Sequence, residues 1–375
     1  MPRCAGNLPE LDMKRIVADE ARGIKFSSDK RVLSKYPCTL RSAEYVIPSG
    51  VIAIKHEAFQ ECQFIRTVRI PEGVMFIGDS VFSRCKKLAS VRIPKSVIQM
   101  GNYVFWGCES LTDVEIPDGI MELCDSFFHG CSSLKNVVIP RSVKKIGDAF
   151  RDCRSLTHIE IPEGVTAIKG WTFGECFKLM SVNIPNSVKS IGEWAFHDCS
   201  SLTEVVIPDG VTSIENSTFL NCRELQRVVI PESVTKIGES AFSRCRKLIE
   251  AVVPEGVTEI GEWAFGECES LTQVTIPHGV TKICDNSFLF CKGITEMDIP
   301  SNVIEIGERA FAGCENLTEV VIPNGVLLIG EMAFKKCSKL TKVSLPTSIV
   351  HVGDEAFAGC PCESELKKKY PHLFP

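Results

Sequence analysis

The stretch that decides the fold is IPDGVTSIENSTFLNCRELQRVVI, residues 207–230. We predict that seven of its apolar residues are buried: Val211, Ile214, Phe219, Cys222, Leu225, Val228 and Ile230. Val228 and Ile230 are separated by one residue, which is the in-out-in alternation of a short strand. Pro231 follows at once and ends that strand, because proline has no N–H for a strand ladder. A second extended piece is expected at residues 211–214, and after it a tight helical turn that carries Phe219.

The same pattern recurs along most of the chain. Prolines fall at positions 48, 71, 94, 117, 140, 162, 185, 208, 231, 254, 277, 300, 323 and 346, so every step is 23 residues except one of 22. A phenylalanine follows each proline in register, and a cysteine lies three residues after each phenylalanine. The repeat thus uses 14 of the 20 prolines and 14 of the 19 cysteines. The short step lacks one residue between Ile146 and Phe150, in a predicted turn that can absorb the loss.

A unit of 23 residues cannot bury so small an apolar set alone, and stacked neighbours build a shared core. We therefore predict a solenoid, although a length of 375 residues would otherwise suggest two or three globular domains. Residues 48–360 form 14 stacked coils in this prediction. Terminal coils need caps, because open ends expose core and strand edges. We assign residues 1–47 to an N-terminal cap, with a helix over 8–22 and a degenerate coil over 26–37. Residues 361–375 form a C-terminal cap with a polar helix over 363–370.

Composition excludes several classes of protein. A chain that is 44% hydrophobic and 24% charged can bury a core, so it is not disordered. A net charge of −5 argues against a nucleic-acid partner, which usually calls for a basic face. No window approaches the roughly 18 consecutive apolar residues of a membrane-spanning helix. Lys14 and Arg15 stand where a signal peptide would have its apolar run, so we expect a cytoplasmic protein.

The repeat also resembles a known family. The pattern Leu-x-x-Val-x-Ile-Pro-x-x-Val-x-x-Ile-Gly-x-x-Ala-Phe-x-x-Cys, which recurs between Pro48 and Cys360, is similar to the BspA-like leucine-rich repeat of the Treponema pallidum type. This resemblance implies a curved leucine-rich-repeat solenoid of short strands and tight turns. It also implies a non-enzymatic binding role, often that of a surface adhesin that recognises host matrix proteins. A cell-surface or secreted location is therefore the alternative to the cytoplasm.

The cysteine column is the main candidate for chemistry. We interpret it as a ladder of buried thiols that act as small hydrophobes, although stacked coils would place the Cα atoms near enough for disulfides. A metal needs ligands that converge on one point, whereas a column spreads them along a line. The seven histidines show no ligand spacing, and no catalytic or nucleotide-binding motif occurs. We expect no catalytic residue, no metal and no cofactor, and a thiol- or metal-using sensor or enzyme is the alternative.

What varies between coils can encode recognition of a partner protein. The residue between the two buried positions of the strand must point away from the core, and in three adjacent coils it is Val206, Val229 or Val252. Charged residues flank these valines two positions earlier: Glu204, Arg227 and Glu250. An apolar strip bordered by charge is typical of a protein-binding surface, and solenoids commonly bind through a concave face. The alternative is that β-branched residues simply favour strand surfaces. The same column begins with Arg69 and Arg92, which we include in the predicted binding face.

Tryptophans mark a second, outer candidate surface. The residue before the Ala-Phe pair is usually small or polar, yet it is Trp171 and Trp194 in adjacent coils and Trp263 in a later one. Exposed tryptophans often anchor protein interfaces. The alternative is that these rings lie flat over the turn and cover its backbone.

Overall fold

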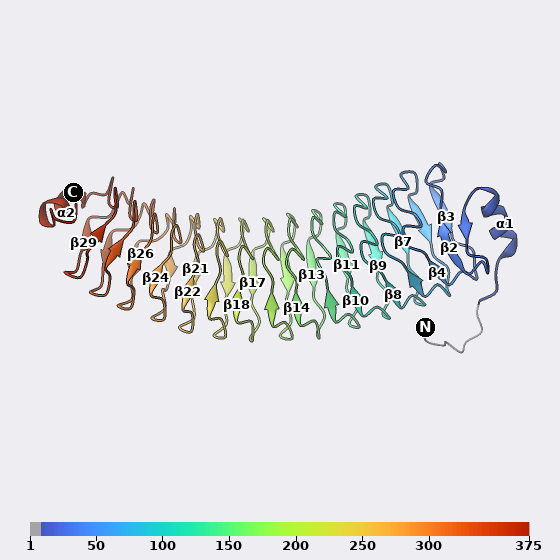
Figure 1. Cartoon of the computed structure of the whole chain (residues 1–375), viewed down its shortest axis with the longest axis horizontal. Helices are drawn as coiled ribbons and strands as arrows, with labels where there is room; N and C mark the ends of the chain where they lie inside the picture. Colours follow the sequence, from blue (N-terminus) through green and yellow to red (C-terminus); the bar gives the residue numbers. More distant parts are fainter. Residues whose placement is uncertain (1–8, 375) are drawn as a thin grey trace. The chain divides into compact units, whose positions relative to one another are not determined.

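The computed structural model describes residues 9–374 (Figure 1). Leu8 and Pro375, the outer residues of two predicted segments, lie outside this range, as do the other residues of 1–8. The chain divides into two compact units, which we describe separately. Unit 1 contains Met1–Thr166 and Thr172–Pro185, and unit 2 contains Ala167–Trp171 and Asn186–Pro375.

Each coil contributes two short strands, so two strand ladders run along each unit. The odd-strand ladder of unit 1 consists of β3 (Glu44–Val46), β5 (Thr67–Arg69), β7 (Ser90–Arg92), β9 (Asp113–Glu115), β11 (Asn136–Val138), β13 (His158–Glu160) and β15 (Ser181–Asn183). In unit 2 it consists of β17 (Glu204–Val206), β19 (Arg227–Val229), β21 (Glu250–Ala251), β23 (Gln273–Val274), β25 (Glu296–Asp298), β27 (Glu319–Val321) and β29 (Lys342–Ser344). These strands end where the repeated proline follows, as the sequence predicts.

The even-strand ladder is built from the second extended piece of each coil. In unit 1 it consists of β2 (Val32–Lys35), β4 (Ala53–Ile54), β6 (Phe76–Ile77), β8 (Gln99–Met100), β10 (Glu122–Leu123) and β12 (Lys145–Ile146). In unit 2 it consists of β14 (Ala167–Ile168), β16 (Ser190–Ile191), β18 (Ser213–Ile214), β20 (Lys236–Ile237), β22 (Glu259–Ile260), β24 (Lys282–Ile283), β26 (Glu305–Ile306), β28 (Leu328–Ile329) and β30 (His351–Val352). Pairing between coils is parallel and in register, for example Val205 with Val228 and Ile214 with Ile237. Successive copies of one position therefore lie side by side.

The core of each unit lies between the ladders and the turn segments. All seven positions predicted from residues 207–230 are buried, with exposed fractions from 0% to 9%. The phenylalanines stack face to face, and in unit 2 the ring centroids from Phe196 to Phe357 are separated by 5.2–5.7 Å. In unit 1, Tyr36 of the degenerate coil stacks on Phe59 at 5.0 Å and so extends the column. The predicted solenoid is confirmed.

The turn segment differs from the predicted helical turn. In the coil at 207–230 it is a run of consecutive turns, with Ser217 and Asn221 in the left-handed region at φ of 54° and 64°. The backbone N–H groups of Ser217 and Asn221 donate to Glu239 and Ser243 in the next coil, each at 2.8 Å. A helical turn would use such N–H groups within itself. Here they join neighbouring coils instead.

The coil that lacks one residue keeps its strand register. Ile146 of β12 pairs with Leu123, 23 residues earlier, whereas Phe150 stacks on Phe128, 22 residues earlier, at 5.6 Å. The loss is therefore absorbed in the turn between Ile146 and Phe150, as predicted. In a full-length coil, the left-handed turn residue donates its N–H to a backbone carbonyl of the next coil, as Tyr103 does to Asp125 at 3.0 Å. In the short coil the carboxylate of Asp148 replaces that carbonyl. Its Oδ1 accepts the backbone N–H of Ser126 at 2.6 Å, and its Oδ2 accepts the Ser126 hydroxyl at 2.9 Å.

The ends of the described chain carry its two helices. Helix α1 (Met13–Ala21) begins later than the predicted 8–22, because Asp12 is its N-cap and accepts the backbone N–H of Arg15 at 3.1 Å. Strand β1 (Lys25–Phe26) pairs antiparallel with β2, which matches the predicted hairpin-like coil. Helix α2 (Glu363–Lys369) lies within the predicted 363–370. The capping role of both segments stays a prediction.

Candidate protein-binding surface

The structure brings the predicted valine strip together on the odd-strand ladder of unit 2. Glu204 pairs with Arg227 and Val206 with Val229 between β17 and β19, and Arg227 pairs with Glu250 of β21. Val206 and Val252 are 54% and 58% exposed. Val229 between them is half-buried. Neighbouring strands lie about 4.8 Å apart, so three β-branched side chains form one narrow strip.

The charges beside the strip are partly paired. The guanidinium of Arg227 donates from Nη1 to Glu204 Oε1 at 3.1 Å, and both side chains are at least half exposed. Such an exposed pair adds at most about 1 kcal/mol to stability, because water screens it. The pair instead fixes the position of the Arg227 guanidinium, which lies between the residues Glu204 and Glu250 on the ladder, beside the valines. The border of the strip therefore carries a net negative charge.

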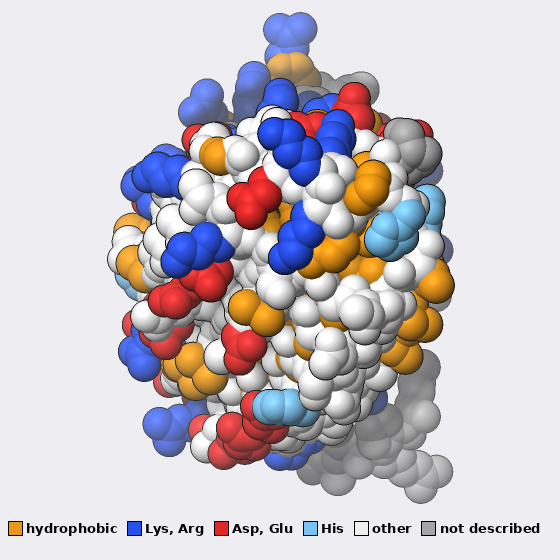
Figure 2. All heavy atoms as spheres, turned by 90° about the vertical axis from the view of Figure 1, so that its left-hand side faces the viewer, with side chains coloured by type: hydrophobic (Ala, Val, Ile, Leu, Met, Phe, Trp, Pro, Cys, Tyr) orange, Lys and Arg blue, Asp and Glu red, His pale blue; other side chains and the backbone are white. Residues whose placement is uncertain are grey.

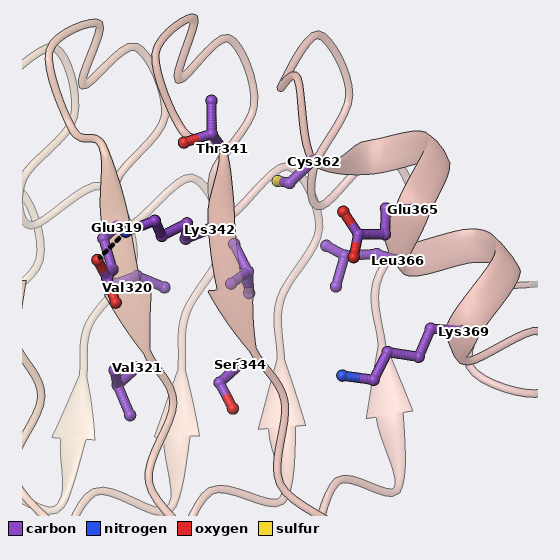
Figure 3. A pocket seen from close by; sticks show the side chains of 11 residues that line it. Glu319, Val320, Val321, Thr341, Lys342, Ser344, Cys362, Glu365, Leu366 and Lys369 are labelled. Carbon is purple, nitrogen blue, oxygen red and sulfur yellow. Dashed lines mark hydrogen bonds and ion pairs between the residues drawn. The ribbon is translucent and has the colours of Figure 1, made fainter.

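A further exposed valine occurs in the same column, beyond Thr275 and Asp298. Figure 3 shows the C-terminal part of this column, where Glu319 and Lys342 form an ion pair at 3.3 Å and Val321 and Ser344 follow them along β27 and β29. Val321 is 57% exposed. A cavity of about 240 Å³ lies between β29 and α2, and Leu366 and Lys369 line it. Val321 occupies the same repeat position as the valines of the strip. We did not predict it as part of the strip, because the adjacent coils have Asp298 and Ser344 at that position.

The predicted arginines lie in the other unit. Arg69 of β5 and Arg92 of β7 are exposed and directly opposite each other in unit 1. Unit 1 also contains Val138, the most exposed valine at 78%, which lines a groove of about 1220 Å³ with His158 and Glu160. Unit 1 therefore contains the arginine pair and a groove, whereas the valine strip belongs to unit 2.

The three predicted tryptophans occupy left-handed turn positions and are half-buried. Trp171 and Trp194 stack on each other, with ring centroids 5.1 Å apart, and the His197 ring meets Trp194 edge-on at 5.0 Å. Trp263 lies over its own turn, because a Cβ on Gly266 would come within 2.8 Å of the Trp263 ring. This position fits the alternative in which the ring covers the turn backbone. The interface hypothesis for the tryptophans stays a prediction.

A fourth tryptophan, which the sequence analysis did not single out, lines a pocket in unit 1. The Arg84 guanidinium lies 4.5 Å from the Trp106 ring centroid, and both residues border a cavity of about 480 Å³. Gly107 and Gly130, which leave this space open, occupy the left-handed turn position in adjacent coils. In the sequence, the signal for this pocket is a glycine directly before the repeat cysteine in two adjacent coils, at Gly107 and Gly130.

The cysteine ladder is buried, as predicted, and it also makes hydrogen bonds. The thiol of Cys85 donates to the carbonyl of Phe59 at 2.9 Å, and that of Cys245 to Phe219 at 3.3 Å. Burial raises the pKa of Cys85 and of Cys314 to about 12, so these groups stay protonated thiols at neutral pH. The first ladder cysteine differs, because Cys62 forms a disulfide with Cys38.

Between residues 9 and 374, no three His, Cys, Asp or Glu side chains are grouped so that they could hold a metal ion. Within the same residues, neither helix is long and apolar enough to cross a membrane.

Comparisons with known proteins agree with the repeat and the fold. Residues 36–149, 147–271 and 237–364 match the model of the BspA type leucine-rich repeat region, in six copies. No curated protein matches the sequence. A leucine-rich repeat protein from Bacteroides ovatus is 26% identical, with 90% of each chain covered and a TM-score of 0.65. A leucine-rich cell surface protein from Faecalibacterium prausnitzii is 26% identical, with 86% of this chain and 92% of that chain covered and a TM-score of 0.53.

A third solved structure is similar in fold. The leucine-rich repeat protein from Eubacterium ventriosum is 24% identical, with 89% of this chain and 91% of that chain covered and a TM-score of 0.50. The family model spans residues 36–364, which contain the coils described above. The chain therefore belongs to the family of BspA-type leucine-rich repeat proteins.

Proposed function

We propose that this chain is a non-catalytic protein-binding solenoid and that the odd-strand ladder of unit 2 contacts its partner. The observation that carries this proposal is the exposure of Val206 and Val252 on a rigid, paired ladder beside Glu204, Arg227 and Glu250. Protein-binding patches combine an apolar centre with a polar rim. The coils are tied by backbone hydrogen bonds at every step, so the surface is preformed and association needs little rearrangement.

A paired capture experiment tests this proposal. The intact chain and a variant with Val206→Thr, Val229→Thr and Val252→Thr are used as baits against the proteome of the source cells and their surroundings. Threonine keeps the β-branched shape that strands favour, so the fold is retained while the apolar strip is lost. A partner that binds the intact chain and is lost with the variant supports the proposal. Equal capture by both baits contradicts it.

A second candidate function is that of a cell-surface binding protein. Two observations favour it: the similarity to the Faecalibacterium prausnitzii cell surface protein, and the disulfide between Cys38 and Cys62. Disulfides persist mainly in oxidising compartments outside the cytosol. Neither the structure nor the comparisons support the cytoplasmic location that we expected from Lys14 and Arg15.

Location can be measured directly. Intact cells are treated with a membrane-impermeant biotin reagent, and the labelled fraction of the protein is compared with that of a known cytosolic protein. Labelling of this chain alone supports the surface function. Protection equal to that of the cytosolic control removes it and leaves the protein-binding proposal in place.

A further inference from the structure

One column of the even-strand side changes its character near the C-terminal end of unit 2. The residue before each even strand is Thr in four successive coils: Thr212, Thr235, Thr258 and Thr281. In the next three coils it is Ile304, Leu327 and Val350, which are 49%, 41% and 71% exposed. Leu328 stands beside this column on β28 and is 38% exposed. We call these four residues the C-terminal apolar patch.

Two neighbouring columns carry fewer charged residues in these three coils than in the coils before them. The residue after the repeated proline is acidic in three successive coils, at Asp209, Glu232 and Glu255. It is His278 in the next coil and then Ser301, Asn324 and Thr347 here. On the even strands, Lys236, Glu259 and Lys282 give way to Glu305, Leu328 and His351. In Figure 2, which views the molecule from its C-terminal end, exposed hydrophobic side chains gather along the right-hand side. Glu305 keeps its charge and forms an ion pair with Lys282 at 2.9 Å, so the loss of charge is confined to the column after the proline and to Leu328 and His351 on the even strands.

Packing within the chain does not account for the patch. The Thr235 hydroxyl donates to the carbonyl of Thr212 in the preceding coil at 3.2 Å, a bond that isoleucine, leucine and valine cannot make. Each of the four side chains still leaves between 38% and 71% of its surface exposed. Strand preference favours Ile304 and Val350 but not Leu327 or Leu328, because leucine is not β-branched. Exposed contiguous apolar side chains with a polar border indicate a contact surface.

We propose that the C-terminal apolar patch joins two copies of this chain as a two-fold symmetric dimer. The side chains of the patch repeat with the coil spacing, and the stacked rings of Phe311, Phe334 and Phe357 in the same coils are 5.2 Å apart. A second copy presents the same spacing, so the two columns can match side chain for side chain. With the two-fold axis at the middle coil, Leu327 meets its own counterpart, and Ile304 meets Val350 of the partner subunit.

Charge also favours a second copy as the partner. Each chain carries a net charge of −5, so two copies repel each other over most of their surface. On the side where Ser301, Asn324 and Thr347 lie, the border of the patch is uncharged and adds no such repulsion. Glu305 beside Ile304 is paired with Lys282 of the preceding coil. A strongly charged partner would gain nothing from such a border.

Unit 1 provides a matched control. The same column is apolar in four successive coils there, at Ile52, Met75, Ile98 and Met121, and the last two are 46% and 58% exposed. In the column after the proline, Lys95 and Asp118 flank Ile98 and Met121, where the patch has uncharged residues. The proposal therefore assigns the dimer contact to unit 2 and none to Met121.

The experiment measures molar mass by light scattering and sedimentation across a wide range of protein concentration. The unaltered chain is expected to form a dimer. A variant with Leu327→Thr and Val350→Thr, which restores the residue of four other coils, is expected to dissociate at least tenfold more readily, with an unchanged circular dichroism spectrum. Met121→Thr is expected to leave the dimer intact. A chain that stays monomeric at every concentration overturns the proposal, and so does a dimer that persists in the double threonine variant.

A charge exchange tests the antiparallel geometry. Ile304→Lys alone is expected to break the dimer, because it places an unpaired ammonium opposite Val350 of the partner subunit. Adding Val350→Glu is expected to restore the dimer through two symmetric ion pairs, whereas adding Val350→Lys is not. Equal behaviour of the two double variants contradicts the two-fold arrangement and with it the proposal.

Discussion

Each phenylalanine of the repeat is buried, and within each unit the phenylalanines of adjacent coils stack on one another. Phe242, with 0% exposure, lies 5.4 Å from the ring of Phe219 and 5.4 Å from that of Phe265. The cysteine three residues later fills the adjacent space and donates its thiol to a phenylalanine carbonyl. These two residue types therefore supply both the core and part of the cross-coil hydrogen bonding.

Phe242→Ala is expected to lower the free energy of unfolding by about 3–5 kcal/mol, because it opens a cavity between two stacked rings. Urea unfolding monitored by circular dichroism measures the change. Val206→Ala, at an exposed position, is the control and is expected to have a far smaller effect. A Phe242 variant as stable as this control would contradict the packing of the column.

The ladder thiols predict a loss of stability at alkaline pH. Burial raises the pKa of Cys314 from its ordinary value of 9.0 to about 12 in the folded protein. The unfolded chain therefore releases this proton first, so stability is retained below pH 9 and is lost as the pH rises toward 12. Urea midpoints across this range measure the loss. The Cys314→Ala variant is expected to lose stability less steeply, by about 1.4 kcal/mol per pH unit, and an identical slope would contradict the prediction.

At the scale of the element, the turn segments join neighbouring coils, and the two helices lie near the ends of the described chain. Each turn donates backbone N–H groups to the next coil, so a defect in one turn is felt by its neighbour. Asp148 corrects such a defect in the short coil through its bonds to Ser126. At the N-terminal end, the hydroxyl of Tyr45 on β3 donates to the buried carboxylate of Asp19 on α1 at 2.7 Å.

Asp148→Ala is expected to reduce the free energy of unfolding by about 1–3 kcal/mol, because it leaves the buried N–H and hydroxyl of Ser126 without their acceptor. Thermal and urea unfolding measure the effect. Asp354→Ala alters an exposed residue at the corresponding position of a full-length coil, and it is expected to change little. A similar loss in both variants would show that the Asp148 carboxylate does not replace the missing carbonyl.

Tyr45→Phe is expected to loosen α1, since it removes the hydroxyl that donates to Asp19 and leaves a buried carboxylate with one partner fewer. The cost is about 1–3 kcal/mol. Hydrogen exchange should rise in Met13–Ala21 and stay unchanged in β25 and later strands. Uniform exchange rates in the variant and the unaltered chain would contradict the proposed capping role of this helix.

At the scale of the whole molecule, stability is a sum over coils and the contacts between adjacent coils. Within unit 2, strand residues pair with their copies 23 residues away, as Ile214 does with Ile237. The units tolerate different residues on their surfaces because the core and the backbone bonds repeat. We therefore expect functional differences between coils to lie in their exposed side chains, such as those of the valine strip and the C-terminal apolar patch.

Deletion of residues 231–253, one complete repeat, is expected to leave a folded protein with slightly lower stability. The deletion joins Ile230 to Pro254 and brings the Phe219 and Phe265 positions into adjacent coils, so the pattern stays in register. Deletion of residues 231–252 is the control. It leaves one extra residue beside a strand, where a shift by one residue turns side chains to the wrong face. Equal melting temperatures of the two deletions would contradict this account.

The period of the repeat, its buried positions, the strand ends at the prolines and the membership of a solenoid family could all be predicted from the sequence. This was possible because each coil contacts chiefly the next copy of itself, so a local pattern fixes its own neighbours. The valine strip could be predicted for the same reason, since residues 23 apart must lie side by side.

Only the tertiary structure decided the rest. The cross-coil donors of the turns, the carboxylate of Asp148 in place of a carbonyl and the pairing of Cys38 with Cys62 depend on backbone paths between coils. The exposure of Leu327 and Val350 and the position of Trp263 over its own turn depend on which side of a coil remains open. A repeat pattern shows which residues occupy equivalent positions. The contacts and exposures named here occur where one coil differs from its neighbours, and there they depend on the surrounding atoms.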